Sequence, residues 1–235
     1  MTQSSQASKV IVALDYADSA RAIACAKSLS SFGVRFKVGM ELFYSAGPGI
    51  VEEIKKQGEV FLDLKLHDIP QTMAKTVSVL ANYGVWMTTV HAAAGSEALQ
   101  QTVTAANEAA DKVGLNAPLI MAVTLLTSLP NLSHVGSAWQ APEAVANLAI
   151  LARRAGCQGV ICSVLEAARV KAADPLCLTV TPGIRLPGHA AGDQVRTATP
   201  AAAIASGSDF LVVGRPITGA ADPAAALTQI LADLL

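Results

Sequence analysis

The densest run of side chains that could do chemistry lies between Phe61 and Pro70, where the chain reads FLDLKLHDIP. Successive side chains of an extended strand alternate between two faces, so Asp63 and Lys65 share one face and the intervening leucines share the other. The leucines suit packing against helices, which directs the carboxylate and the ammonium to the opposite side. Because buried charges are costly unless they pair, the spacing predicts an ion pair with catalytic potential.

Two further charges are expected beside this pair. Asp15 ends the first apolar run and Lys37 ends the second, so both would lie next to Asp63 and Lys65 if the runs are neighbouring parallel strands. A lone Asp-x-Lys is usually a structural salt bridge. Four charges of alternating sign at three neighbouring strand ends favour a functional array instead.

Asp68 lies just past this run, followed by Ile69-Pro70 and, at the start of the next expected helix, Thr72. Taken alone, Asp68 could be an ordinary helix N-cap. We assign His67 no role, because a lone loop histidine more often packs than catalyses.

A second zone suits an anionic ligand. It contains Thr181–Arg185 (TPGIR), the glycine-flanked loop Leu186–Asp193 with Gln194 after it, and Val212–Thr218 (VVGRPIT). Gly214 permits close backbone approach, N–H groups at the start of a short helix favour an anion, and Arg215 adds a bidentate donor. A surface arginine in a tight turn would look similar, but the combination predicts a phosphorylated ligand.

Short apolar runs alternate with amphipathic stretches along the whole chain. The expected strands are Val10–Leu14, Val34–Val38, Glu59–Leu64, Val85–His91, Pro118–Thr124, Gly159–Ser163, Leu176–Val180 and Phe210–Val213. The expected helices are Ser19–Phe32, Pro48–Gln57, Gln71–Tyr83, Ser96–Lys112, Pro142–Ala155, Leu165–Ala173, Pro200–Ser206 and Pro223–Leu235.

Eight such units predict an α/β fold, a single (β/α)8 TIM barrel over residues 10–235. The candidate residues then fall at the C-terminal ends of strands, where barrel enzymes have their active sites. An open doubly wound sheet is the alternative, and the lack of a GxGxxG motif after the first strand weakens its dinucleotide-binding form.

The composition narrows the function classes. A net charge of −1 and a charged fraction of 15% give no sign of nucleic-acid or anionic-membrane partners. No apolar run is long enough to span a membrane, and the polar residues 1–9 predict a frayed tail, not a targeting peptide. The four cysteines show no CxxC pairing, which predicts reduced buried thiols, no metal site and a cytoplasmic protein.

Four motifs together resemble the orotidine 5′-monophosphate decarboxylase family. They are Asp63-x-Lys65-x-x-Asp68-Ile-Pro, Lys37-Val-Gly, Pro182-Gly-Ile-Arg185 and Val213-Gly-Arg215-Pro-Ile. The resemblance extends from Val10 to the final helix, in the same order and at compatible spacing. It implies a carboxy-lyase that converts orotidine 5′-monophosphate (OMP) to UMP in de novo pyrimidine biosynthesis, with no cofactor.

The resemblance also implies roles for single residues. Lys65 would protonate C6 of the pyrimidine after carbon dioxide leaves. Asp63 would lie beside the scissile carboxylate, with Lys37 and Asp68 completing the charged array. Asp15 and Lys37 would bind ribose hydroxyls.

The remaining implied roles concern the partner subunit and the far end of the substrate. Asp68, Ile69 and Thr72 would reach into the neighbouring subunit's site, which implies a homodimer with shared active sites. The other implied substrate-binding residues are Thr127 at the pyrimidine, Pro182 and Arg185 near the phosphate, and Gln194, Gly214 and Arg215 on the phosphate itself. The loop 186–193 would close over it.

Two other functions remain open. Metal-dependent relatives on the same barrel, of the 3-keto-gulonate-phosphate decarboxylase or hexulose-phosphate synthase type, share the Asp-x-Lys pattern but have a glutamate where Lys37 stands. A cation there opposes Mg²⁺ binding. A non-catalytic phosphate-binding barrel could keep Gln194, Gly214 and Arg215, yet it would have no reason to retain the charged array.

Overall fold

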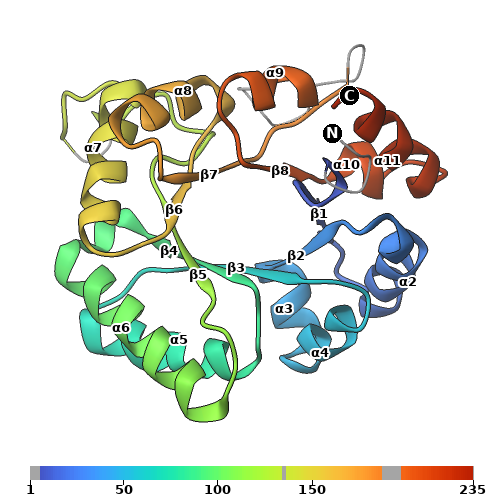
Figure 1. Ribbon diagram of the computed structural model, residues 1–235, viewed down its shortest axis with the longest axis horizontal. Helices are drawn as coiled ribbons and strands as arrows, with labels where there is room; N and C mark the ends of the chain where they lie inside the picture. The colour runs from blue at the N-terminus through green and yellow to red at the C-terminus, as the bar shows by residue number, and fades with distance from the viewer. Residues whose placement is uncertain (1–5, 134–135, 187–196, 235) are drawn as a thin grey trace.

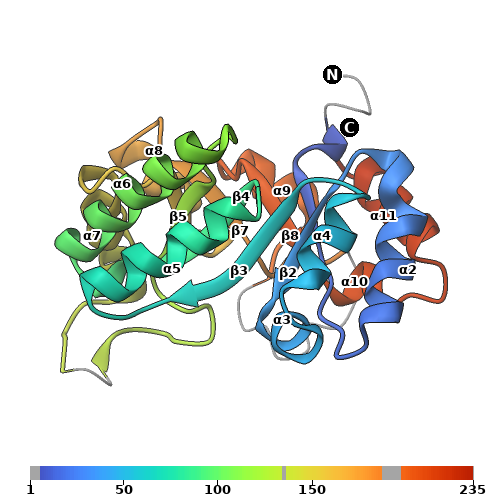
Figure 2. The same ribbon diagram turned by 90° about the horizontal axis from the view of Figure 1, so that it is seen from below.

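Eight parallel strands form a closed barrel in the computed structural model, which describes residues 6–133, 136–186 and 197–234. Each strand pairs with the next along the chain, and β8 closes the ring by pairing with β1 (Figure 1). In the second view, α5 and α6 flank one side of the strands while α2 and α11 flank the other (Figure 2). The expectation of a (β/α)8 TIM barrel is therefore confirmed.

The strands are β1 (Val10–Ala13), β2 (Arg35–Gly39), β3 (Val60–Leu66), β4 (Met87–His91), β5 (Leu119–Val123), β6 (Gly159–Ile161), β7 (Leu178–Thr181) and β8 (Phe210–Val213). The α-helices are α2 (Ser19–Leu29), α3 (Met40–Ala46), α4 (Gly49–Lys55), α5 (Pro70–Asn82), α6 (Ser96–Val113), α7 (Ala141–Arg154), α8 (Val164–Ala173), α9 (Pro200–Ala205), α10 (Arg215–Thr218) and α11 (Pro223–Ala232). Short 3₁₀ turns, Ser30–Phe32 and Ala92–Ala94, follow α2 and β4.

The strands bury both of their faces. Buried apolar side chains that face inward fill the barrel interior. They are Ile11, Ala13, Phe61, Met87, Met121, Val180 and Val212. Outward-facing side chains pack under the helices in two large clusters, one around β1–β3 and β8 and the other around β4–β6. Because Phe36, Val38, Leu62 and Leu64 face outward, Lys37 and Asp63 must face the barrel interior.

The region around β2 and β3 differs from the expected boundaries. β3 extends to Leu66 instead of ending at Leu64, because its register against β4 shifts between Leu62 and Leu66. Helix α3 was not expected. It is only seven residues long, Leu42 is its one buried residue, and so it carries no readable helical periodicity.

The expectation of a frayed tail is wrong for residues 6–9. Gln6 and Ala7 are buried, and Arg35 donates a hydrogen bond to the Ser8 carbonyl oxygen. The carbonyl oxygen of Lys9 accepts a bond from the backbone N–H of Leu211. Residues 6–9 form a helical turn directly before β1, which their polar composition does not reveal. Residues 1–5 lie outside the described residues.

All four cysteines are buried, and none of them forms a disulfide within the described residues. Burial raises the pKa of Cys157 to about 12 and that of Cys177 to about 11, so neither is an activated nucleophile. Within the described residues, no helix combines the length and the apolar character that crossing a membrane requires.

Candidate active site

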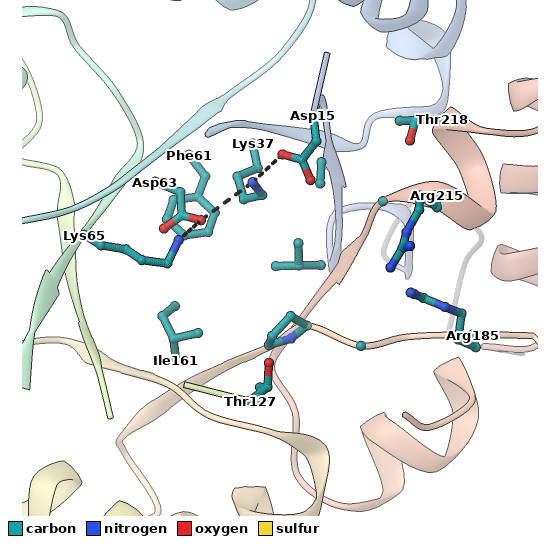
Figure 3. Close-up of a pocket in the computed structure, with 15 residues that line it drawn as sticks. Asp15, Lys37, Phe61, Asp63, Lys65, Thr127, Ile161, Arg185, Arg215 and Thr218 are labelled. Carbon is teal, nitrogen blue, oxygen red and sulfur yellow. Dashed lines mark hydrogen bonds and ion pairs between the residues drawn. The ribbon is translucent and has the colours of Figure 1, made fainter. Parts of the chain in front are cut away.

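A cavity of about 440 Å³ opens at the C-terminal mouth of the barrel, a size that suits a small-molecule ligand. Its charged lining residues are Asp15, Lys37, Asp63, Lys65, Arg185 and Arg215 (Figure 3). The uncharged residues that line its walls are Thr127, Thr218, Pro182, Gly183 and Gly214. Its apolar floor consists of Ala13, Phe61, Ile161 and Val212. Nine candidate residues thus meet in one cavity, from loops and strands far apart in the sequence.

Four of the charged side chains form a continuous array of alternating sign along one wall (Figure 3). Lys37 Nζ lies 2.9 Å from Asp15 Oδ1 and 3.6 Å from Asp63 Oδ2. Lys65 Nζ lies 2.9 Å from the same Asp63 oxygen. The side chains of Lys37 and Asp63 are each only 11% exposed. Mutual pairing is what allows charges to remain at such depth.

The two most deeply buried members of the array, Lys37 and Asp63, keep their charges at neutral pH. Burial by itself would raise the pKa of Asp63, but the charges of Lys37 and Lys65 outweigh it and the pKa is lowered. Burial would lower the pKa of Lys37, but Asp63 and Asp15 outweigh it and the pKa is raised. Asp63 therefore loses its stabilising contribution only as the pH falls through its lowered pKa, and Lys37 only as the pH rises through its raised one.

Lys65 is held in an unusual backbone conformation. Its φ is 52°, and among the residues that the structure describes it is the one non-glycine residue with a positive φ. This conformation costs a non-glycine residue roughly 1–2 kcal/mol. Such strain persists only where the surrounding structure imposes it, and it concentrates at functional sites.

Gly39 is a residue of the site that the sequence analysis did not assign. A Cβ at this position would lie 2.9 Å from Lys37 Nζ and 3.1 Å from Asp15 Oδ1. Any other residue would therefore displace the Lys37–Asp15 pair. The signal was present in the sequence, because the residue two positions after an inward-facing lysine also faces inward.

Two arginines lie at the opposite end of the cavity from Lys65 (Figure 3). Arg185 follows β7 and Arg215 begins α10 after β8. Burial, together with the neighbouring charge of Arg215, lowers the pKa of Arg185. A Cβ at Gly214 would meet only ordinary contacts, at 3.6 Å or more, so packing within the chain does not demand glycine there. Two like charges beside an uncrowded backbone are suited to binding an anion.

Asp68, Ile69 and Thr72 do not line this cavity. All three are exposed, on the rim between β3 and α5. Asp68 is not the N-cap of α5, because the helix begins at Pro70 with Ile69 as its N-cap. Its Oδ1 accepts a hydrogen bond from the adjacent backbone N–H of Ile69. Gln194 and positions 187–193 of the proposed closing loop lie outside the described residues.

The fold and the cavity together define a (β/α)8-barrel enzyme with a charged site at the C-terminal mouth. Residues 8–230 match the model of the orotidine 5′-phosphate decarboxylase / HUMPS family. The chain belongs to this family, as its motifs led us to expect.

Individual relatives agree with this assignment. The orotidine 5′-phosphate decarboxylase of Sodalis glossinidius is 49% identical over 231 residues, covering 97% of this chain and 90% of that protein. The one of Teredinibacter turnerae is 49% identical over 228 residues, covering 95% and 96%. The crystal structure of orotidine 5′-phosphate decarboxylase from Lactobacillus acidophilus superimposes with a TM-score of 0.82 at 38% identity, covering 96% of this chain and 98% of that one.

Proposed function

We propose that this chain is a carboxy-lyase that decarboxylates OMP to UMP in de novo pyrimidine biosynthesis, without a cofactor. The family and the names of its relatives support the reaction. The observation that carries the proposal is the alternating array Asp15–Lys37–Asp63–Lys65, which places a buried carboxylate between two ammonium groups inside one cavity.

In the proposed reaction, the bond between C6 and the substrate carboxylate breaks, and its electron pair stays on C6 as carbon dioxide leaves. The ring cannot delocalise this pair, so stabilisation must come from fixed charge. The Lys65 ammonium faces the developing anion and then donates a proton to C6, which gives UMP. The neutral lysine regains its proton from water. Asp63 would lie beside the scissile carboxylate, next to a charge that is lost in the reaction.

The rest of the cavity would orient the nucleotide. Asp15 and Lys37 would bind ribose hydroxyls, and Thr127 would face the pyrimidine. The arginine end, with Arg185 beside Pro182 and Arg215 beside Gly214, would bind the phosphate. Gln194 would join them there when the loop 186–193, which precedes it, closes.

The position of Lys37 opposes the metal-dependent alternative. Its ammonium lies between the carboxylates of Asp15 and Asp63, within 3.6 Å of both. A divalent cation shared by these carboxylates would have to displace a charge of its own sign. We therefore propose no metal ligand among these residues.

The reaction is tested by the absorbance change of OMP with purified protein in EDTA. We expect rapid conversion to UMP at a rate that excess EDTA or added Mg²⁺ leaves unchanged. The proposal would be overturned by a folded protein that leaves OMP intact but turns over sugar phosphates when Mg²⁺ is supplied.

We also propose that the enzyme is a homodimer with shared active sites. Asp68, Ile69 and Thr72 lie outside the cavity of their own chain, and Ile69 is 66% exposed although its side chain is large and apolar. A second subunit would cover Ile69 and bring Asp68 next to the charged array of its partner. An isologous dimer makes both sites complete at once.

Mixed dimers test this arrangement. Lys65→Ala and Asp68→Ala proteins should each be inactive, but chains mixed by refolding should recover about a quarter of wild-type activity, because half the dimers then contain one intact site. If each chain instead built its own complete site, every site in the mixture would carry one defect and no activity would return. Sedimentation of the wild type gives the oligomeric state independently.

The proposed location is the cytoplasm, where thiols stay reduced, because the four cysteines show no CxxC spacing and all four are buried. The proposed partners are OMP, UMP and a second copy of the chain. We propose neither nucleic acid nor a membrane as a partner, because the formal net charge of the chain is only −1.

A further inference from the structure

Strand β3 contains an insertion relative to β4 at the level of the active site. Leu62 pairs with Thr88 and Leu66 pairs with Val90, so a four-residue step on β3 faces a two-residue step on β4. Asp63 and Lys65 both lie within this step, and Lys65 has the left-handed backbone described above. A bulge interrupts the ladder and redirects side chains, so another group must hold its residues in place.

Thr89 is the residue of β4 that faces the insertion. Its hydroxyl donates a hydrogen bond to Asp63 Oδ1 at 2.9 Å and accepts one from the backbone N–H of Lys65 at 2.9 Å. The residue is fully buried, so water does not compete for these bonds. One hydroxyl thus joins the carboxylate of Asp63 to the backbone of Lys65.

The two oxygens of the Asp63 carboxylate consequently have different partners. Oδ1 accepts from Thr89, while Oδ2 faces Lys65 Nζ at 2.9 Å and Lys37 Nζ at 3.6 Å. The terminal torsion of an aspartate is broad and does not fix the plane of the carboxylate by itself. The Thr89 hydroxyl supplies the constraint that leaves one oxygen directed at the two ammonium groups.

We propose that Thr89 is a positioning residue for Lys65 and Asp63. It lies outside the cavity lining and acts through these two residues, by holding the left-handed backbone of Lys65 and the plane of the Asp63 carboxylate. The inference rests on the proposed decarboxylation. It adds a requirement beyond the charged groups. A neutral hydroxyl on β4 must donate to the Asp63 carboxylate and accept from the backbone N–H of Lys65.

Thr88 provides a matched control within the same pair of strands. It is also fully buried, and its hydroxyl also donates one hydrogen bond to β3, to the Leu62 carbonyl oxygen at 2.9 Å. That bond does not involve the charged array. Replacing either threonine by valine keeps the β-branched shape and removes a buried hydroxyl, so both variants should lose thermal stability.

The test measures kcat and KM for OMP, UMP affinity and Tm for Thr89→Val and Thr88→Val. We expect Thr89→Val to lower kcat by about 10- to 100-fold, with KM and UMP affinity changed by less than about threefold, because misplaced reacting groups slow the chemical step. Thr88→Val should keep kcat within about twofold despite a comparable fall in Tm. Equal kcat losses in the two variants, or an unchanged kcat in Thr89→Val, would overturn the proposal.

A second pair covers the case in which Thr89→Val fails to fold. Thr89→Ser and Thr89→Ala both lack the γ-methyl group and differ only in the hydroxyl. The serine variant should retain kcat within about threefold of the wild type, while the alanine variant should lose as much as the valine variant. Equal kcat in the two would refute the role of the hydroxyl. A wild-type protein without OMP turnover would instead refute the proposed function.

Discussion

Replacing Lys65 by alanine is expected to lower kcat for OMP by about 10⁴-fold or more, because the change removes both the proposed general acid and the positive charge proposed to face the carbanion. The ammonium is 2.9 Å from Asp63 and lines the cavity at the wall opposite the two arginines. Single-turnover measurements with OMP report the chemical step directly. A variant that retained more than about 1% of the wild-type rate would show that another group is the proton donor.

Two controls separate chemistry from folding. Lys27→Ala removes an exposed lysine in the last turn of α2 that does not line the cavity, and it should leave kcat unchanged. Lys65→Gly should be as inactive as Lys65→Ala, yet more stable than it by about 1 kcal/mol, because glycine accepts the positive φ of this position without strain. Urea unfolding of the two variants measures the difference. Equal stabilities would mean that the variant backbone relaxes out of the left-handed region.

Replacing Arg215 by alanine is expected to lower kcat/KM for OMP by about 10- to 100-fold, although the residue lies at the far end of the cavity from Lys65. The uncatalysed reaction is so slow that its barrier must fall by roughly 20 kcal/mol, more than the few charges beside C6 supply. Binding energy from the phosphate end would contribute to the rest through orientation and closure of the site.

The matched measurement uses orotidine, which lacks the phosphate. Wild type and Arg215→Ala should process orotidine at the same low rate, because the guanidinium then has no phosphate to bind. If Arg215→Ala reduced both substrates equally, the residue would be supporting the fold of the loop after β8, not the ligand. An unchanged kcat/KM for OMP would remove Arg215 from the site.

Much of the scaffold was predictable because it rests on local rules. Buried parallel strands read as short apolar runs, and helices follow them at short intervals, so eight βα units are visible in the sequence. The alternation of side chains in the third strand predicted that Asp63 and Lys65 share the face that points into the barrel mouth. The motif around Lys65 identified the family, which the matching family model confirms.

The site itself was predictable in outline and not in its contacts. The sequence named Lys65 and Arg215, but not that they would face one another across a single cavity. It named Asp68 with Lys65 in one motif, yet the exposed rim position of Asp68 separates the two within the chain. Helix α3 was missed because a seven-residue helix with one buried position shows no period.

The sequence by itself determined the order of the elements, the inward face of the third strand and the set of charges at the strand ends, since these depend on residues a few positions apart. Only the tertiary structure decided the insertion in β3, the left-handed Lys65 and the two bonds of the Thr89 hydroxyl. Those features arise from the register between two strands whose interacting residues are 24 and 26 positions apart. Register depends on how the whole barrel closes, so no local pattern in either strand contains it.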